Sequence, residues 1–525
     1  MSGAKAIAAT LKELGVEHVF GIVGIPVVEQ QASLAASIYG YLTHKPGVLL
    51  VVGGPGIVNS VAGAYNAASN KWPLLVLAGS SSLATREKGA FQELDQVAMM
   101  DRWTKHSYRV VNPAQTVDYL AQAYVLAQIG VPGCTYVDLP EDIILGKTEL
   151  LSKIKNINSL TFSFTTPEKT KIKKTGVLLK NARFPLLVVG KGAARAWKSL
   201  RQFVDTHEIA FLPTPMAKGI IQDKSEYNIS SARSYALKHA DVVLVVGARL
   251  NWILHFGEAP KFNKNVKLIQ IDSDPQELAR GATLLTQALH GHVETTIRAL
   301  DDELNAHKFP NLPAELKQVV SQREKVLQQR ESVQNPDLMP SHSQALAAVE
   351  RNVPATATIV AEGARTMDLS RQSLLMSEPK QRLDAGTNGT MGVGLAYAVT
   401  ARLTAEKHRM VVAVQGDSAF GFSAMEVETL VRERLPCLVV VLNNSGIYNG
   451  VQDPLKYFPY TQTPLPPTSL SYGVRYDQVC ASLGGGGYFV ERCRELDTVL
   501  KKGVEDVLGG KVVVVNVLVG SYAKL

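Results

Sequence analysis

Residues 411–450 read VVAVQGDSAFGFSAMEVETLVRERLPCLVVVLNNSGIYNG. The apolar run at 411–414 is typical of a buried strand, and a helix-patterned segment separates it from a second apolar run at 437–442. A strand, a helix and a second strand in this order form a unit in which the two strands are parallel. Their carboxyl ends open on the same edge of the sheet, where ligands of such sheets bind.

Polar residues follow both predicted strands. Asp417 comes after the first strand and Asn444 after the second, so that 444 − 417 = 27 residues separate them. A carboxylate, an amide oxygen and a backbone carbonyl near Gly446 are hard oxygen ligands, which suit Mg²⁺ bound together with a diphosphate. The alternative is an ordinary strand–helix–strand unit whose loops are merely polar.

Composition limits what kind of protein this is. The chain has 525 residues, of which 46% are apolar, and this length predicts about three domains. No apolar run approaches the ~18 residues of a membrane span, and the four cysteines are far apart, as expected of reduced core residues. The net charge is +8, but no basic stripe is interleaved with aromatic residues, which argues against nucleic acid as a partner.

The whole chain alternates short apolar runs with helix-patterned segments, which predicts α/β domains with parallel sheets flanked by helices. We expect domains at 1–145, 176–308 and 337–525, joined by a linker at 146–175 and a charged linker helix at 309–336. The predicted strands are 19–23, 48–52, 74–78 and 135–139 in the first domain, 186–189, 242–246 and 267–271 in the second, and 358–361, 411–414, 438–442 and 512–518 in the third.

Two glycine turns end strands of the first domain, at Gly24-Ile25-Pro26 and at 53–56, which places them where ligands bind. Asn59, Asn66 and Asn70 follow the second turn on a predicted helix. For these asparagines we weigh ligand contact and helix packing equally.

Several stretches resemble one branch of the thiamine diphosphate-dependent enzymes, that of the 2-hydroxyacyl-CoA lyases and oxalyl-CoA decarboxylases. The resemblance runs nearly the whole length of the chain, and RLNW at 249–252 and the final Ala523-Lys524-Leu525 look closer to the peroxisomal lyases. The stretches are FGIVGIPVVE (20–29), GAFQELDQVA (89–98), ADVVLVVGARLNWILHFG (240–257), EGARTMD (362–368), RLDAGTNGTMGVGL (382–395) and GDSAFGFSAMEVETLVR (416–432).

The resemblance implies a pyrimidine-binding, a central and a diphosphate-binding domain, with thiamine diphosphate and Mg²⁺ as cofactors. The implied metal ligands are Asp417, Asn444 and Gly446. The implied cofactor-binding residues are Gly24, Ile25, Pro26, Asn59, Thr390, Met391, Gly416, Asp417, Ser418, Asn444, Gly446 and Ile447. The implied catalytic residues are Glu29, Phe91, Gln92, Glu93 and Tyr448, and Lys218, Arg233, Arg249 and Asn251 are expected near the phosphate and ribose of ADP or CoA in the central domain.

The implied reaction, in fatty acid α-oxidation, cleaves a 2-hydroxyacyl-CoA thioester to formyl-CoA and a fatty aldehyde, and the family alternative is decarboxylation of oxalyl-CoA. The family also implies a homodimer or homotetramer. Ala523-Lys524-Leu525 resembles the address read by the peroxisomal import receptor, with a cytoplasmic location as the alternative.

Three departures from the family pattern bear on activity. A short helix and a strand are missing before Glu29, so Glu29 aligns either with the catalytic glutamate or with an acid at a helix start, and the sheet is expected to be disrupted there. The chain stops soon after 512–518, where the family has a lid-like tail. Arg365 and Asn388 occupy positions at which this branch of the family usually has other residues. The alternative to an active enzyme is therefore a protein of this fold that binds the cofactor but no longer catalyses a reaction.

Overall fold

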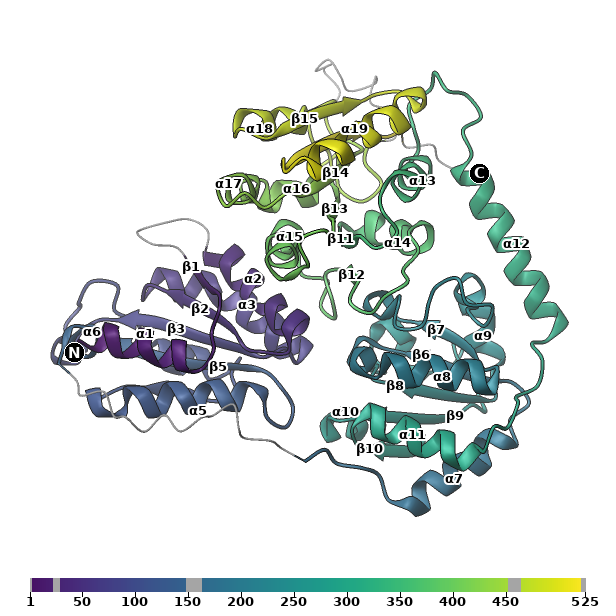
Figure 1. The fold of residues 1–525 in the computed structure, drawn as a ribbon, viewed down its shortest axis with the longest axis horizontal. Coiled ribbons are helices and arrows are strands. Elements are labelled where there is room, and N and C mark those ends of the chain that lie inside the picture. Colours follow the sequence, from purple (N-terminus) through teal and green to yellow (C-terminus); the bar gives the residue numbers. More distant parts are fainter. Residues whose placement is uncertain (1, 22–28, 148–162, 452–463, 521–525) are drawn as a thin grey trace. The chain divides into compact units, whose positions relative to one another are not determined.

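The computed structural model describes residues 2–21, 29–147, 163–451 and 464–520. They form two compact units, one of Met1–Ser163 with Ala385–Glu406 and one of Phe164–Asp384 with Lys407–Leu525 (Figure 1). The described residues form three parallel sheets, one in the first unit and two in the second, which confirms the predicted fold class. No helix in the described ranges is long and apolar enough to cross a membrane.

The sheet of the first unit has the order β1-β2-β3-β5-β4. Its strands are β1 (Val19–Gly21), β2 (Gly47–Val51), β3 (Leu74–Ser80), β4 (Ser107–Arg109) and β5 (Cys134–Pro140). Apolar side chains of α1 (Gly3–Glu13) and α5 (Thr116–Gln128) pack with Val48, Leu75 and Val137 of the strands in one core. The predicted strands are present, and β4 is an additional strand that is too short and too exposed to give an apolar signal.

Strand β1 pairs directly with β2, with Val19 opposite Val48 and Phe20 opposite Leu49. The sheet is therefore continuous, and the disruption expected from the missing segment is not found. Phe20 is buried, so even this short strand contributes an apolar side chain to the unit.

Helices α2 (Glu29–Thr43), α3 (Pro55–Asn70) and α15 (Val393–Thr404) pack together in the first unit. The Asn66 amide donates to Ser37 Oγ at 3.0 Å and to Tyr397 Oη at 2.7 Å, and Thr400 Oγ1 donates to Ala35 O at 2.9 Å. Residues 385–406, which the sequence analysis assigned to the third domain, thus belong to the first compact unit.

The central sheet, in the second unit, has the order β10-β9-β8-β6-β7. Its strands are β6 (Pro185–Val189), β7 (Ala210–Pro213), β8 (Val242–Val246), β9 (Lys267–Asp272) and β10 (Leu285–His290). Helix α7 (Lys169–Lys180) begins inside the range predicted as a linker. The linker prediction was wrong there because lysines hide the amphipathic spacing of Ile172, Thr175 and Leu179, which are buried on the side facing α11 (Val293–Leu304).

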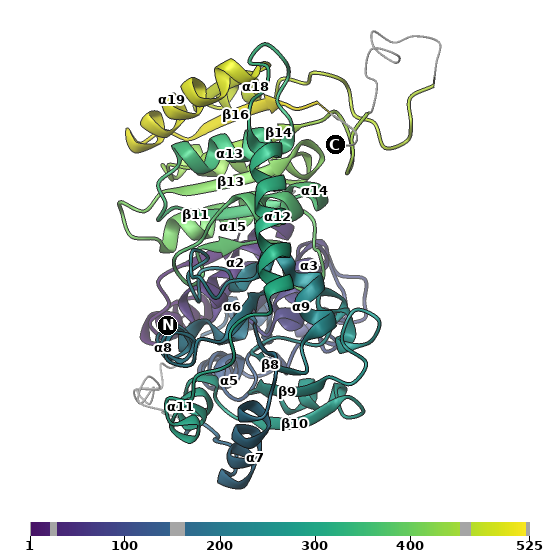
Figure 2. The ribbon, with the colours of Figure 1, turned by 90° about the vertical axis from the view of Figure 1, so that its right-hand side faces the viewer.

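The third sheet has the order β12-β11-β13-β14-β16-β15. Its strands are β11 (Thr358–Glu362), β12 (Arg382–Leu383), β13 (Val411–Gly416), β14 (Leu438–Asn443), β15 (Gly486–Val490) and β16 (Val513–Leu518). After β11 the chain adds β12 on one side and β13 on the other, so the connections reverse direction between β11 and β13. Helix α12 (Ala314–Glu331) runs beside both sheets of this unit and contacts α9 (Arg233–His239) and α13 (His342–Asn352) (Figure 2).

The contact between α2 and α3 gives a test of this packing. A Cβ atom at Gly63 would lie 2.3 Å from the backbone carbon of Ser33. Alanine normally stabilises a helix interior by about 1 kcal/mol over glycine, but here overpacking should reverse the sign, so we expect Gly63→Ala to lower the free energy of unfolding by about 1–3 kcal/mol. Gly421→Ala, on a helix with nothing within 4 Å of the added Cβ, is the matched control and should be neutral or stabilising in thermal unfolding. Equal midpoints for the two variants would contradict the described helix contact.

Candidate active site

Asp417 lies at the carboxyl end of β13, next to the point where the sheet connections reverse. Its position follows from the register, because Gly416 pairs with Leu442 of β14 and Asp417 then begins α16 (Asp417–Ser423). The side chain is only 2% exposed, and Oδ2 accepts a hydrogen bond from Gly446 N at 3.0 Å. Burial raises the pKa of Asp417 to about 6. A carboxylate desolvated in this way is stabilised by backbone donors and by any cation beside it.

The segment 444–450 forms a tight turn against Asp417. Ser445 and Tyr448 adopt left-handed backbone conformations, with φ of +59° and +57°, and non-glycine residues do so at an energetic cost that often marks functional sites. The Asn444 amide donates to Tyr448 O at 3.0 Å, and Ile447 N donates to Thr468 O at 2.8 Å. A Cβ at Gly450 would come within 2.2 Å of Asn444 O, so glycine is required there.

These residues fit a hard cation. Asp417 supplies a buried carboxylate. In the turn that contacts it, the Ser445 hydroxyl is buried without a hydrogen-bond partner, which calls for an explanation such as an ion. Groups of three or more His, Cys, Asp or Glu side chains that could hold a metal do not occur in the described part of the chain. A magnesium site here would therefore combine Asp417 with the amide of Asn444 and the backbone near Gly446.

The neighbouring strand completes this edge of the sheet. Glu362, the last residue of β11, accepts a hydrogen bond from the Gln415 side chain at 2.9 Å, and Gly363 precedes α14 (Ala364–Ser373) with φ of +100°. Arg365 in the first turn of α14 donates to Asn449 Oδ1 at 2.6 Å. The unusual arginine thus connects α14 to the turn that follows Asn444.

Glu29 is the first residue of α2 and only 3% exposed. The Asn59 amide donates to Glu29 Oε2 at 3.4 Å, and a Cβ at Gly56 would lie 3.5 Å from Glu29 Oε1. The carboxylate therefore lies at the amino end of α3, close to the second glycine turn. Gly24, Ile25 and Pro26 lie outside the described residues.

The segment 87–93 is organised by Glu93. Its carboxylate accepts hydrogen bonds from the backbone N–H groups of Glu87, Gly89 and Ala90, and these bonds lower the pKa of Glu93. The described contacts of its carboxylate are thus with its own loop, and the role of Glu93 beside a reacting carbon stays a prediction. Phe91, in contrast, is 82% exposed, and Gln92 has a left-handed φ of +57°.

The remaining predicted cofactor residues divide between the two units. Thr390 and Met391 are half-buried in the first unit, just before α15, whereas Ser418 and the half-exposed Ile447 and Tyr448 belong to the second. Asn70 donates to Asn66 O at 2.8 Å and accepts from Thr387 N at 3.2 Å. Of the three asparagines, Asn66 and Asn70 therefore have packing roles, and Asn59 contacts Glu29.

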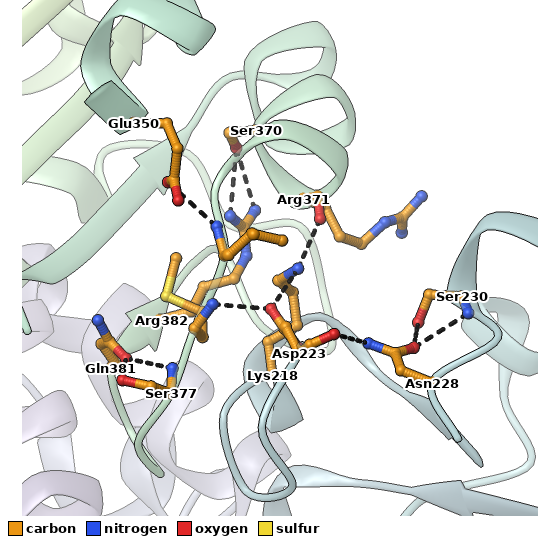
Figure 3. Close-up of polar contacts among 12 residues, drawn as sticks. Lys218, Asp223, Asn228, Ser230, Glu350, Ser370, Arg371, Ser377, Gln381 and Arg382 are labelled. Atoms are coloured by element: carbon orange, nitrogen blue, oxygen red, sulfur yellow. Dashed lines mark hydrogen bonds and ion pairs between the residues drawn. The ribbon is translucent and has the colours of Figure 1, made fainter. Parts of the chain in front are cut away.

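Lys218, which the resemblance implies near the phosphate and ribose of ADP or CoA, is buried beside a carboxylate. Its Nζ lies 2.7 Å from Asp223 Oδ2 and donates to Arg371 O at 2.8 Å, and its side chain is 7% exposed (Figure 3). Asp223 Oδ2 also accepts from Met376 N at 2.8 Å. Lys218 and Asp223, which follow β7, therefore connect to α14 and to the segment after it. The role of Lys218 near the phosphate and ribose of ADP or CoA stays a prediction.

The other central-domain residues lie near strand ends. Arg233 donates to Ile253 O, and Asn251 Oδ1 accepts from Ile253 N at 3.1 Å, so both organise the segment after β8. Arg249 Nε lies 3.4 Å from Glu277 Oε1. Asp272, at the end of β9, was not predicted, although its place directly after an apolar strand is a usable signal. Burial raises the pKa of Asp272 to about 6.

Family models match all three domains. The thiamine pyrophosphate enzyme N-terminal binding domain matches residues 25–99, the central domain matches 172–300, and the C-terminal binding domain matches 362–517. Thiamine pyrophosphate is another name for thiamine diphosphate.

Curated relatives match along almost the entire chain. A 2-hydroxyacyl-CoA lyase of Saccharomyces cerevisiae is 42% identical, covering 95% of this chain and 92% of the relative. The 2-hydroxyacyl-CoA lyase 1 of Homo sapiens is 38% identical, covering 96% and 93%. An oxalyl-CoA decarboxylase of Escherichia coli K12 is 34% identical, covering 99% and 95%. The chain therefore belongs to the thiamine diphosphate-dependent enzymes, in the branch that contains 2-hydroxyacyl-CoA lyases and oxalyl-CoA decarboxylases.

Proposed function

We propose that this protein is a thiamine diphosphate- and Mg²⁺-dependent carbon–carbon lyase that converts a 2-hydroxyacyl-CoA thioester into formyl-CoA and a fatty aldehyde. The observation that carries the proposal is the buried Asp417 carboxylate at the end of β13, bonded to Gly446 N of the strained 444–450 turn. The reaction is balanced without an external oxidant, because the hydroxyl carbon leaves as the aldehyde and the thioester carbon gains the proton. Oxalyl-CoA decarboxylase is the second candidate, since a relative with this name is 34% identical.

When bound, thiamine diphosphate supplies a carbon that adds to the substrate and then holds the electron pair released by carbon–carbon cleavage. We assign Asp417, Asn444 and Gly446 to the metal, and Gly416, Ser418 and Ile447 to the surroundings of the diphosphate. Thr390 and Met391 are assigned to the cofactor rings. These roles agree with the donor chemistry of the 444–450 turn, which offers oxygen ligands and backbone groups to a phosphate-bound cation.

Glu29 is assigned the proton-holding role. A carboxyl group buried at the amino end of α3 can hold a proton at Oε1 or Oε2 and share it with a ring nitrogen, while the Asn59 amide, 3.4 Å from Oε2, limits its rotation. Phe91, Gln92, Glu93 and Tyr448 are assigned to the substrate side. Phe91 is 82% exposed and Tyr448 is half-exposed, which leaves both rings open to solvent.

The central domain is assigned to the ADP part of CoA. Arg249 and Asn251 follow β8, and Asp272 ends β9, which places them near the carboxyl edge of the central sheet, where nucleotides bind in such folds. Arg233 begins α9 and donates to Ile253 O in the segment after β8. An arginine offers a planar donor set to phosphate oxygens. A homodimer or homotetramer, a peroxisomal location and binding to the import receptor stay predictions, and Ala523-Lys524-Leu525 lies outside the described residues.

Product analysis tests the reaction. The purified protein, with thiamine diphosphate and Mg²⁺, is incubated separately with a 2-hydroxyacyl-CoA and with oxalyl-CoA. We expect formyl-CoA and aldehyde in equal amounts from the first substrate. If only oxalyl-CoA reacts, giving carbon dioxide and formyl-CoA, the protein is an oxalyl-CoA decarboxylase instead. If neither substrate reacts, the result favours a protein that binds the cofactor without catalysis.

A second prediction concerns Glu29. Glu29→Gln keeps the size of the side chain but removes the acid, so cofactor affinity in calorimetry should change less than about threefold, whereas exchange of the reactive cofactor proton, followed by NMR, should fall at least ~100-fold. Glu17→Gln, at an exposed glutamate of the same unit that pairs with Lys45, is the control. Fast exchange in the Glu29→Gln protein would show that another group activates the cofactor.

A further inference from the structure

The glycine turn between β2 and α3 is a meeting point of two predicted active-site segments. Gly54 caps α3 with φ of +56°, and a Cβ on it would lie 2.7 Å from Gln92 O, so the 87–93 segment packs directly on this turn. Two residues later, Gly56 approaches the Glu29 carboxylate, since a Cβ there would be 3.5 Å from Oε1. A shift of this turn would therefore displace both Glu29 and Gln92.

One buried side chain holds the turn in place. Gln96 begins α4 (Gln96–Met100) and is fully buried. Its Oε1 accepts a hydrogen bond from Gly54 N at 3.2 Å, while Nε2 donates to Gly79 O at 2.8 Å and to Asp138 Oδ1 at 2.7 Å. One acceptor and two donors are used at once, so only an amide satisfies this set of partners, and its orientation is fixed.

Asp138, the residue that orients Gln96, is itself fully bonded. Arg109 Nε donates to Asp138 Oδ2 at 2.6 Å, and Tyr136 Oη donates to Oδ1 at 3.1 Å. Asp138 and Tyr136 are fully buried in β5, whereas Arg109 on the edge strand β4 is partly exposed and reaches Asp95 at 3.4 Å. A buried polar network in which every member is bonded is rigid, and the removal of one member leaves the others unsatisfied.

We propose that Gln96, oriented by Asp138 and Arg109, is a positioning residue that holds the Gly53-Gly54 turn and thereby keeps Glu29 and Gln92 in their reactive arrangement. The inference rests on the proposed function, because it assumes that Glu29 and Gln92 border the cofactor and substrate. None of Gln96, Asp138 and Arg109 contacts a reacting atom in that assignment, so each would act through the turn.

The test compares Gln96→Met with a control that breaks buried hydrogen bonds elsewhere on β5. Methionine has a similar length but cannot bond to Gly54 N or Asp138. The control is Thr135→Val, because Thr135 Oγ1 donates to Ala123 O at 2.9 Å at the opposite end of the strand. Both variants should lower the midpoint of thermal unfolding. Hydrogen exchange is then measured by mass spectrometry on peptides covering 53–59 and 87–95, which separates local loosening of the turn from a loss of overall stability. The values of kcat and KM are measured with a 2-hydroxyacyl-CoA.

We expect Gln96→Met to lower kcat about 10- to 100-fold with KM changed less than about threefold, and to speed exchange in both peptides, because small displacements of catalytic groups slow reactions strongly. Thr135→Val should leave kcat within about twofold and exchange in these peptides unchanged. Should Gln96→Met fail to fold, Arg109→Gln at the exposed end of the network should show the same pattern with smaller amplitude.

Two results would overturn the inference. The first is hydrogen exchange in peptides 53–59 and 87–95 of Gln96→Met at the same rate as in the unmodified protein, and the second is a kcat of Gln96→Met no lower than that of Thr135→Val. If the unmodified protein turns over neither thioester, the proposed function fails, and the exchange measurement alone decides whether Gln96 holds the turn.

Discussion

The geometry of the candidate metal site in the third sheet depends on the burial of the Asp417 carboxylate. Strands β13 and β14 are buried apolar runs until Gln415 and Asn443 near their carboxyl ends, and their parallel register places Asp417 beside the 444–450 turn. A shift of one residue in that register would move every side chain of the strand to the other face of the sheet. The apolar core therefore fixes the position of the charge, and the charge in turn holds Gly446 N and the strained turn.

The first unit also contains a buried carboxylate that organises a backbone turn. There the buried Asp138 carboxylate does not face a ligand position but orients Gln96, which bonds to Gly54 N at the start of α3. In both units a carboxylate at the carboxyl edge of a parallel sheet organises a backbone turn. The difference lies in the counter-charge. Arg109 neutralises Asp138, whereas the partners described for Asp417 are backbone donors, so a bound cation would balance its charge.

The fold was largely predictable from the sequence because most strands contain apolar runs, such as 438–442. The missed strands give weak signals, since β4 is half-exposed, β12 has two residues, and β15 begins with two glycines. In the central sheet, β7 and β10 were also missed, because β7 has only four residues and β10 is mostly half-exposed or exposed. At the site, spacing predicted Asp417 and Asn444 as partners, and the structure places Asp417 against the turn that begins at Asn444. The sequence does not reveal the contacts of Lys218 with Asp223 or those of Glu93 with its own loop. Gln96 lies within the stretch 89–98 but was given no role, and Asp138 belongs to no quoted motif, so only the structure reveals their contacts.

The central claim is that Asp417 holds the cofactor through a bridging cation. Its most direct test is calorimetric titration of thiamine diphosphate into the unmodified protein and into Asp417→Asn, each with Mg²⁺ and with a chelator. Ser423→Ala, at a buried hydroxyl on the same helix, serves as the control. The account predicts tight binding that requires Mg²⁺ in the unmodified and control proteins, and a loss of at least ~100-fold in Asp417→Asn, since removal of one metal ligand commonly costs several kcal/mol. Equal affinity in Asp417→Asn, or binding that is indifferent to Mg²⁺, would contradict it.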